Sequence, residues 1–98
     1  MPRKSAQRRL EWSSRADRDY FDAWAYIAQE NVEAADAVAK RIRMAAESLI
    51  FDPLIGRRGQ RPGTRELVVG HTLFTIVYRA HRTVIRIGRI LHQARRYP

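Results

Sequence analysis

Two runs of apolar residues at alternating spacings of three and four constrain the fold of this chain more than any other feature. Positions at this spacing share one face of a helix, so each run predicts an amphipathic helix of roughly four to five turns. The runs are Ala16, Tyr20, Ala23, Trp24 and Ile27, then Ala35, Val38, Ile42, Ala45 and Leu49. The short break at 29–31 predicts an antiparallel hairpin, whose apolar stripe needs another layer to cover it.

The ends of both helices carry capping signals. Ser14 followed by Asp17 resembles a capping box, which predicts that the first helix starts there. Asn31 is the expected N-cap of the second helix, because its side chain can accept a hydrogen bond from the first turn. Pro53 prevents continuation of the second helix, since proline lacks the N–H that a helix interior needs.

Strand patterns flank this hairpin. At 8–12, Leu10 and Trp12 alternate with charged residues, as a strand with one buried face requires. After a glycine- and arginine-rich loop at 54–64, three β-rich runs are separated by turns short enough for hairpins. These runs are Arg65 to Val69, Leu73 to Arg79 and Thr83 to Leu91.

The predicted fold class is therefore α+β, with the order strand, helical hairpin and three-stranded antiparallel sheet (βααβββ). At 98 residues the chain has room for one core, so we expect one domain over 8–98 after a flexible basic arm at 1–7. Trp12 and Trp24 are expected to be core aromatics.

The net positive charge is confined to the second half of the chain. Residues 53–98 hold ten arginines and one acid, Glu66, whereas residues 1–52 hold nine bases and nine acids. A field concentrated in one half of a small domain attracts a polyanion, either nucleic acid or an acidic protein segment. Dispersed charge would suffice for solubility alone.

Several classes of function are disfavoured by composition. The chain has no cysteine, which removes disulfides and thiolate zinc sites and fits a reducing cytoplasm. Its three histidines are scattered without carboxylate partners, so we expect no metal site and no cofactor. No stretch approaches the ~20 apolar residues that span a bilayer, and we expect a cytoplasmic protein without membrane contact.

Seven short patterns, taken in their order and spacing, resemble the RelE/ParE toxin superfamily over most of the chain. They are Ala16-Asp17-Arg18-Asp19, Trp24-Ala25-Tyr26-Ile27-Ala28, Ala34-Ala35, Asp52-Pro53-Leu54-Ile55-Gly56-Arg57, Thr64-Arg65-Glu66-Leu67, Ile76-Val77-Tyr78-Arg79, and Ile90-Leu91-His92 with Arg95. The resemblance implies the toxin of a bacterial type II toxin–antitoxin pair. Its partner would be a cognate antitoxin, partly disordered when free, that folds on the toxin.

The superfamily holds two activities. ParE-like members are regarded as inhibitors of DNA gyrase, whereas RelE-like members cut messenger RNA on the ribosome. The long helical hairpin with its Trp-x-Tyr-Ile and Ala-Ala patterns resembles the ParE branch. The preferred hypothesis is therefore a toxin that inhibits DNA gyrase by binding, without catalytic turnover of its own. A RelE-like endoribonuclease is the alternative, and a toxin fold that serves only in regulatory complexes is a third possibility.

The nuclease alternative needs a base, an acid and cations that stabilise charge on the phosphorane. Candidates for these roles are Arg65, His92, Arg95 and Tyr97. Arg65 matches an arginine at a strand start that RelE-like nucleases use on the scissile phosphate. The catalytic lysines of RelE have no counterpart, because Lys4 and Lys40 lie outside the basic half.

Each catalytic candidate also has a structural explanation. Arg65 beside Glu66 fits a strand-edge ion pair or an antitoxin contact as well as it fits a phosphate contact. His92 closes the last predicted strand, and the Leu-His step occurs in ParE-like sequences too. Tyr97 lies one residue from the terminus, where order is weakest.

Six further arginines are candidates for binding the target or the antitoxin: Arg57, Arg58, Arg61, Arg79, Arg86 and Arg89. The first three lie in the glycine-rich loop, where planar guanidinium groups can grip phosphates. The other three project from strands, and those on the face away from the helices are expected to line a groove that the antitoxin occupies.

Overall fold

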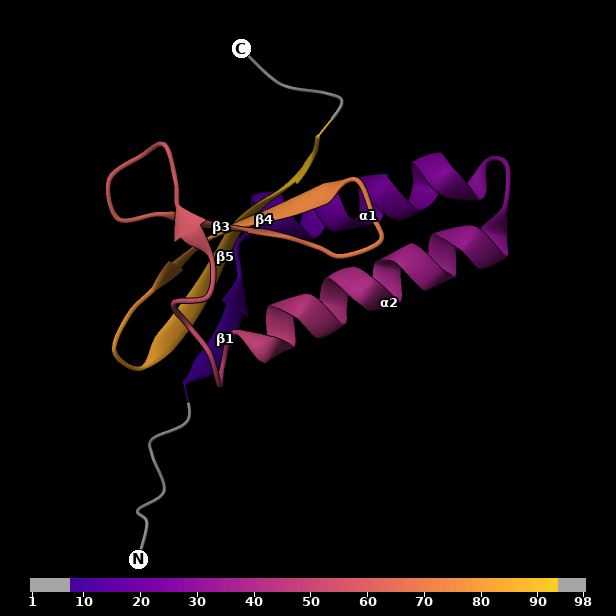
Figure 1. The fold of residues 1–98 in the computed structure, drawn as a ribbon. Helices are drawn as coiled ribbons and strands as arrows, with labels where there is room; N and C mark the ends of the chain where they lie inside the picture. Colours follow the sequence, from indigo (N-terminus) through magenta and orange to yellow (C-terminus); the bar gives the residue numbers. More distant parts are fainter. Residues whose placement is uncertain (1–7, 94–98) are drawn as a thin grey trace, which may run out of the picture.

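The computed structural model describes residues 8–93, and Figure 1 shows the arrangement of its elements. The elements are β1 (Arg9–Trp12), α1 (Ser14–Ala28), α2 (Val32–Ser48), β2 (Arg57–Arg58), β3 (Arg65–Val68), β4 (Phe74–Ala80) and β5 (Val84–His92). The α+β class and the helical hairpin are confirmed. The expected basic arm at 1–7 and the candidates Arg95 and Tyr97 lie outside the described residues.

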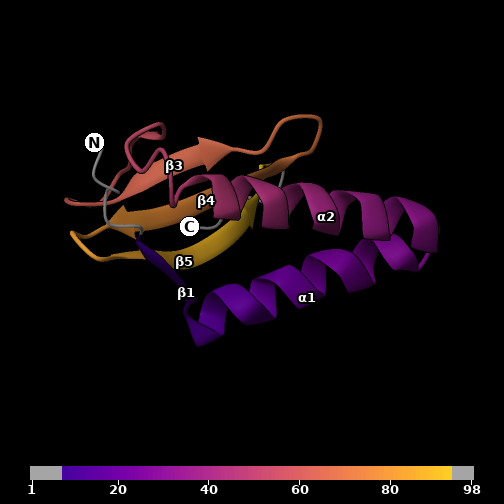
Figure 2. The same cartoon turned by 90° about the horizontal axis from the view of Figure 1, so that it is seen from below.

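All strands join one mixed sheet in the order β1-β5-β4-β3-β2. The strands from β2 to β5 pair antiparallel, whereas β1 pairs parallel to β5 at the edge. Both helices lie against the same face of this sheet, with α1 over β5 and α2 over β4 (Figure 2). The opposite face, which we call the open face, is left without a covering helix.

The sheet has one strand more than the sequence predicts. Arg57 and Arg58 form β2, which extends the sheet beyond β3 inside the segment expected to be a loop. Two arginines between glycines give no periodic signal, so only the pairing with β3 defines this strand. A hydrogen bond from the Gly59 amide to the Thr64 carbonyl, 2.8 Å long, closes the turn that makes the pairing possible.

The helix starts follow the expected chemistry with one correction. Asn31 caps α2 as predicted, its side chain accepting from the Ala34 amide. The cap of α1 is Ser13, whose Oγ accepts from the Ala16 amide at 3.0 Å and donates to the Gly88 carbonyl, so the predicted Ser14 cap is wrong by one residue. The Ser13 hydroxyl therefore provides a hydrogen-bond acceptor for a free N–H at the start of α1 and also links this helix end to β5.

The core lies between the hairpin and the sheet. Its fully buried side chains include Ile42 and Leu49 from α2 with its C-cap, and Ile76, Tyr78, Ile85 and Ile87 from β4 and β5. Trp12 packs against this core, edge-on to Tyr20 with ring centroids 5.4 Å apart. Trp24 is not a core aromatic, because it is half-buried and its indole N–H donates to the exposed Asp36.

Tyr78 connects the core to the segment after α2. Its ring is 1% exposed, and its hydroxyl donates to the Pro53 carbonyl at 2.7 Å and accepts from the Gly56 amide at 3.0 Å. A Cβ at position 56 would lie 2.9 Å from the Glu66 carbonyl, so this contact requires glycine. Burial raises the pKa of the Tyr78 hydroxyl, against the opposing effects of the Gly56 hydrogen bond and the Arg65 charge.

Replacing Tyr78 with phenylalanine keeps the ring and removes both hydrogen bonds, leaving the Gly56 N–H and the Pro53 carbonyl without this partner. We expect the free energy of unfolding to fall by about 1–3 kcal/mol in urea titrations followed by circular dichroism. The matched control is Tyr20→Phe, whose hydroxyl bonds Ala39 and Arg43 nearer to solvent and should cost less. Equal losses for the two variants would contradict the assigned role of Tyr78.

Candidate binding surfaces

The loop between β2 and β3 is held by contacts to the rest of the fold. The Thr64 hydroxyl donates to the Arg61 carbonyl at 2.7 Å, and the Arg79 guanidinium donates to the Pro62 carbonyl at 2.9 Å. Gly63 adopts a φ of 83°, a left-handed conformation that side chains disfavour. The loop is therefore pinned at several points rather than joined only at its ends.

Three arginines surround a pocket in this loop, which we call the arginine pocket. Arg58, Arg61 and Arg65 line it together with Leu54, Gly59, Gln60, Pro62, Gly63, Thr64 and Ala80, and its volume is about 550 Å³. Arg65 donates to the Gly56 carbonyl at 2.7 Å and to the Leu54 carbonyl at 3.3 Å. Its guanidinium thus acts as a brace that links β3 to the segment leading into β2. The pocket lining contains no acidic side chain.

The open face carries arginines that already have carboxylate partners. Arg57 pairs with Glu66 at 3.1 Å, and Arg86 pairs with Glu11 at 2.6 Å. Arg9 also bonds Glu11, and these contacts, with that of Arg9 the strongest, hold the pKa of the Glu11 carboxyl below its usual value. One interpretation of the sequence expected an ion pair between Glu66 and its neighbour Arg65. In the structure Glu66 pairs instead with Arg57 on the adjacent strand.

Arg79 completes the open face. Its Cα is the register partner of Arg86, so two arginines stand opposite each other on neighbouring strands. The exposed Val68 and the half-buried Val77 lie on the same face by the alternation of side chains along a strand. The face thus combines cationic and apolar groups.

Arg89 does not belong to the open face. Its guanidinium forms an ion pair with Asp19 on α1 at 2.8 Å and is only 30% exposed. Asp19 also accepts from the Ile90 amide at 2.9 Å. Arg89 is therefore not one of the strand arginines that could line a groove away from the helices, because its ion pair with Asp19 joins α1 to β5.

The structure separates the two described candidates for RNA cleavage. Arg65 is the register partner of Tyr78 near one end of β4, whereas His92 is the partner of Phe74 at the other end. Four residues of strand correspond to about 13 Å along the sheet. His92 packs edge-on against Phe74, with ring centroids 4.9 Å apart. These two side chains do not form one cluster.

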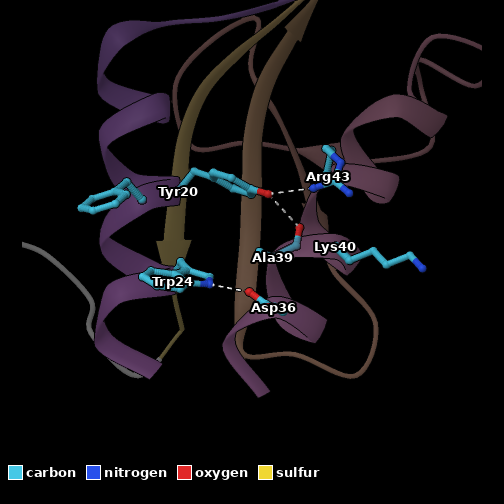
Figure 3. A pocket seen from close by; sticks show the side chains of 7 residues that line it. Tyr20, Trp24, Asp36, Ala39, Lys40 and Arg43 are labelled. Atoms are coloured by element: carbon cyan, nitrogen blue, oxygen red, sulfur yellow. Dashed lines mark hydrogen bonds between the residues drawn. The ribbon is translucent and has the colours of Figure 1, made fainter. Parts of the chain in front are cut away.

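A further surface, the hairpin groove, lies between α1 and α2, and none of its lining residues was among the candidate site residues predicted from the sequence. Figure 3 shows Tyr20 and Trp24 reaching from α1 toward α2, where they bond Ala39 and Asp36. The groove is mainly apolar and is lined by Tyr20, Phe21, Trp24, Asp36, Ala39, Lys40 and Arg43. The spacing of Phe21 and Trp24, three residues apart on one helix, could have predicted an aromatic stripe outside the core.

The described residues form neither a metal-binding cluster nor a membrane-spanning helix. Within residues 8–93, no group of three or more histidine, aspartate or glutamate side chains is arranged to hold a metal ion. Neither α1 nor α2 is long and apolar enough to cross a membrane.

A helical hairpin on one face of a mixed sheet, with an arginine-rich open face and loop, defines the class as the RelE/ParE toxin superfamily. The chain belongs to its ParE branch. The model of the family described as ParE toxin of type II toxin-antitoxin system, parDE, matches residues 10–97. The protein is therefore a toxin-family component of a type II toxin–antitoxin system.

Known proteins agree with this assignment. The chain is 34% identical to "Putative toxin Y4kP" of Sinorhizobium fredii over 93 residues, which cover 95% of this chain and 96% of that protein. Its fold is similar to the chromosomal ParDE system from P. aeruginosa, with a TM-score of 0.78 and 24% identity over 90% of this chain and 98% of that one. The toxin–antitoxin complex RelBE2 from Mycobacterium tuberculosis gives a TM-score of 0.60 and 22% identity, covering 94% and 98%.

The brace formed by Arg65 can be tested by hydrogen exchange. We expect Arg65→Met to speed amide exchange within 54–64 at least tenfold, because hydrogen bonds from a charged donor contribute roughly 1.5–3 kcal/mol. Arg58→Met is the matched control, since no hydrogen bond or ion pair of its side chain is found within residues 8–93. Unchanged exchange in Arg65→Met would show that the guanidinium does not hold the loop.

Proposed function

We propose that this protein is a ParE-like toxin that inhibits DNA gyrase by binding and is neutralised by a cognate antitoxin. The observation that carries the proposal is the match to the ParE family over residues 10–97. Binding without turnover is supported by the separation of Arg65 from His92 and by the use of Arg65 as a brace. The candidate contact arginines are those of the loop and the open face.

The alternative is a RelE-like endoribonuclease using Arg65, His92, Arg95 and Tyr97. The fold is also similar to that of the RelBE2 complex, which supports this alternative. A phosphate contact by Arg65 would require its guanidinium to serve substrate and the Gly56 carbonyl together, or to leave the carbonyl. The two functions differ in which cellular process stops first.

Growth arrest distinguishes these functions directly. After induction of the chain from a tight promoter, we expect DNA synthesis to stop while translation continues, with filamentation and the DNA-damage response. Pulse labelling of DNA and protein before viability falls gives the order of events. A prompt block of translation with cleavage of messenger RNA on ribosomes would contradict the gyrase proposal and favour the nuclease.

The antitoxin is proposed to cover the hairpin groove and the open face. Both surfaces combine exposed large apolar side chains with cations: Phe21 and Lys40 line the same groove, and Val68 lies on the face of Arg79. A segment with apolar residues interspersed with acids fits this chemistry and gains order on binding. The solved relatives are named as toxin–antitoxin assemblies, which supports such a partner here.

Removal of the aromatic ring at the groove should weaken the antitoxin complex. Phe21 is 61% exposed and stacks on Trp24 with ring centroids 6.3 Å apart. We expect Phe21→Ser to reduce affinity for the product of the adjacent small reading frame at least tenfold in calorimetric titration. Val32→Ser is the control, because Val32 is similarly exposed but lies outside the groove. Equal effects of the two substitutions would contradict the placement of the antitoxin there.

A further inference from the structure

We propose that the arginine pocket binds backbone phosphates of double-stranded DNA, so that the toxin itself contacts nucleic acid through a surface separate from the antitoxin. Arg58 and Arg61 would be the phosphate ligands, with Arg65 positioning the loop beneath them. The choice of DNA over another polyanion rests on the proposed gyrase target, whereas the phosphate chemistry follows from the pocket.

The first observation is charge without a counterion. Within residues 8–93, the side chains of Arg58 and Arg61 have no carboxylate partner, in contrast to Arg57 and Arg86 on the open face. Both side chains are exposed, and the lining of the pocket holds no acid. Guanidinium groups with free donors are the groups that bind phosphate oxygens in a planar fork.

The second observation is the register of β2 and β3. Arg58 lies directly opposite Arg65, and like charges at facing positions destabilise a sheet. At the other arginine pair, Arg79 and Arg86, Glu11 compensates one charge and the Pro62 carbonyl accepts from the other. Within the described residues neither Arg58 nor Arg65 forms an ion pair, and only backbone carbonyls accept from Arg65, so a bound anion would reduce the repulsion between the two arginines.

The third observation is that the loop is fixed before any ligand arrives. The bonds from Gly59 to Thr64 and from Arg79 to Pro62 hold the loop, and the bond from Arg65 to Gly56 holds the segment that leads into β2. A pre-organised loop loses less conformational entropy on binding than a free one. The pocket of about 550 Å³ is within the range of ligand sites.

The fourth observation is the separation of faces. Adjacent residues on a strand point to opposite sides, so Arg57 and Glu66 face the open side whereas Arg58 and Arg65 face the helix side. The helices do not cover this end of the sheet, where the segment after Pro53 packs instead. An antitoxin on the open face and hairpin groove would therefore leave the arginine pocket accessible.

The test measures binding of the purified chain to a fluorescent 20-base-pair DNA duplex by anisotropy across a series of salt concentrations. We expect Arg58→Gln/Arg61→Gln to bind on the order of tenfold or more weakly at low salt. The slope of log affinity against log salt should fall by about 2, since each lost phosphate contact removes about 0.9. Circular dichroism confirms the fold, which neither side chain supports by any hydrogen bond or ion pair within residues 8–93.

The matched control is Arg18→Gln/Arg41→Gln, which removes the same charge from exposed positions on α1 and α2. Equal weakening in the two double variants would overturn the proposal, because net charge alone would then explain binding. Tighter binding of single-stranded RNA of the same length would overturn the assignment to DNA. Retained antitoxin affinity in Arg58→Gln/Arg61→Gln would support the separation of the surfaces, and its loss would overturn that part.

Failure of this proposal can be told apart from failure of the proposed function. Gyrase inhibition is measured separately, in a supercoiling assay with purified gyrase and the wild-type chain. Inhibition by a chain that shows no pocket-dependent DNA affinity would refute the phosphate site alone. Pocket-dependent DNA affinity without inhibition would instead refute the gyrase target and leave the phosphate site supported.

Discussion

The hydroxyl of Tyr78 is the contact on which the functional half of the molecule depends. It joins the buried centre of β4 to Pro53 and Gly56 in the segment that leaves α2. From Gly56 the chain enters β2, and Arg65 bonds the same segment from the next strand. The core thereby sets the position of a loop that has little apolar surface of its own.

The alternation of side chains along the strands divides the arginines between two environments. On the open face, Arg57 and Arg86 are compensated by Glu66 and Glu11, which moderates the field there. On the helix side, the arginine pocket has no such compensation within the described residues. A strongly basic half of the sequence thus becomes one mixed apolar and cationic face and one concentrated cationic site, which suit different partners.

The sequence predicted what local chemistry determines and missed what depends on distant contacts. The hairpin, the Asn31 cap, β1 and the three C-terminal strands followed from periodicity and capping. The α1 cap moved to Ser13 because its hydroxyl also reaches β5, and the pairing of Arg89 with Asp19 joins residues far apart in the chain. The sequence offered Arg58, Arg61 and Arg65 as candidates but not the pocket that brings them together, since β2 exists only by its pairing with β3.

Backbone ¹⁵N relaxation of the free protein tests the central claim that the core fixes this loop. If the Tyr78 and Arg65 contacts hold it, the amides of Gly59 and Gly63 should have order parameters close to those of β4, at about 0.85. Values below about 0.6 at these glycines, with a rigid β4, would mean that the loop moves independently of the core. That result would contradict a pre-organised arginine pocket.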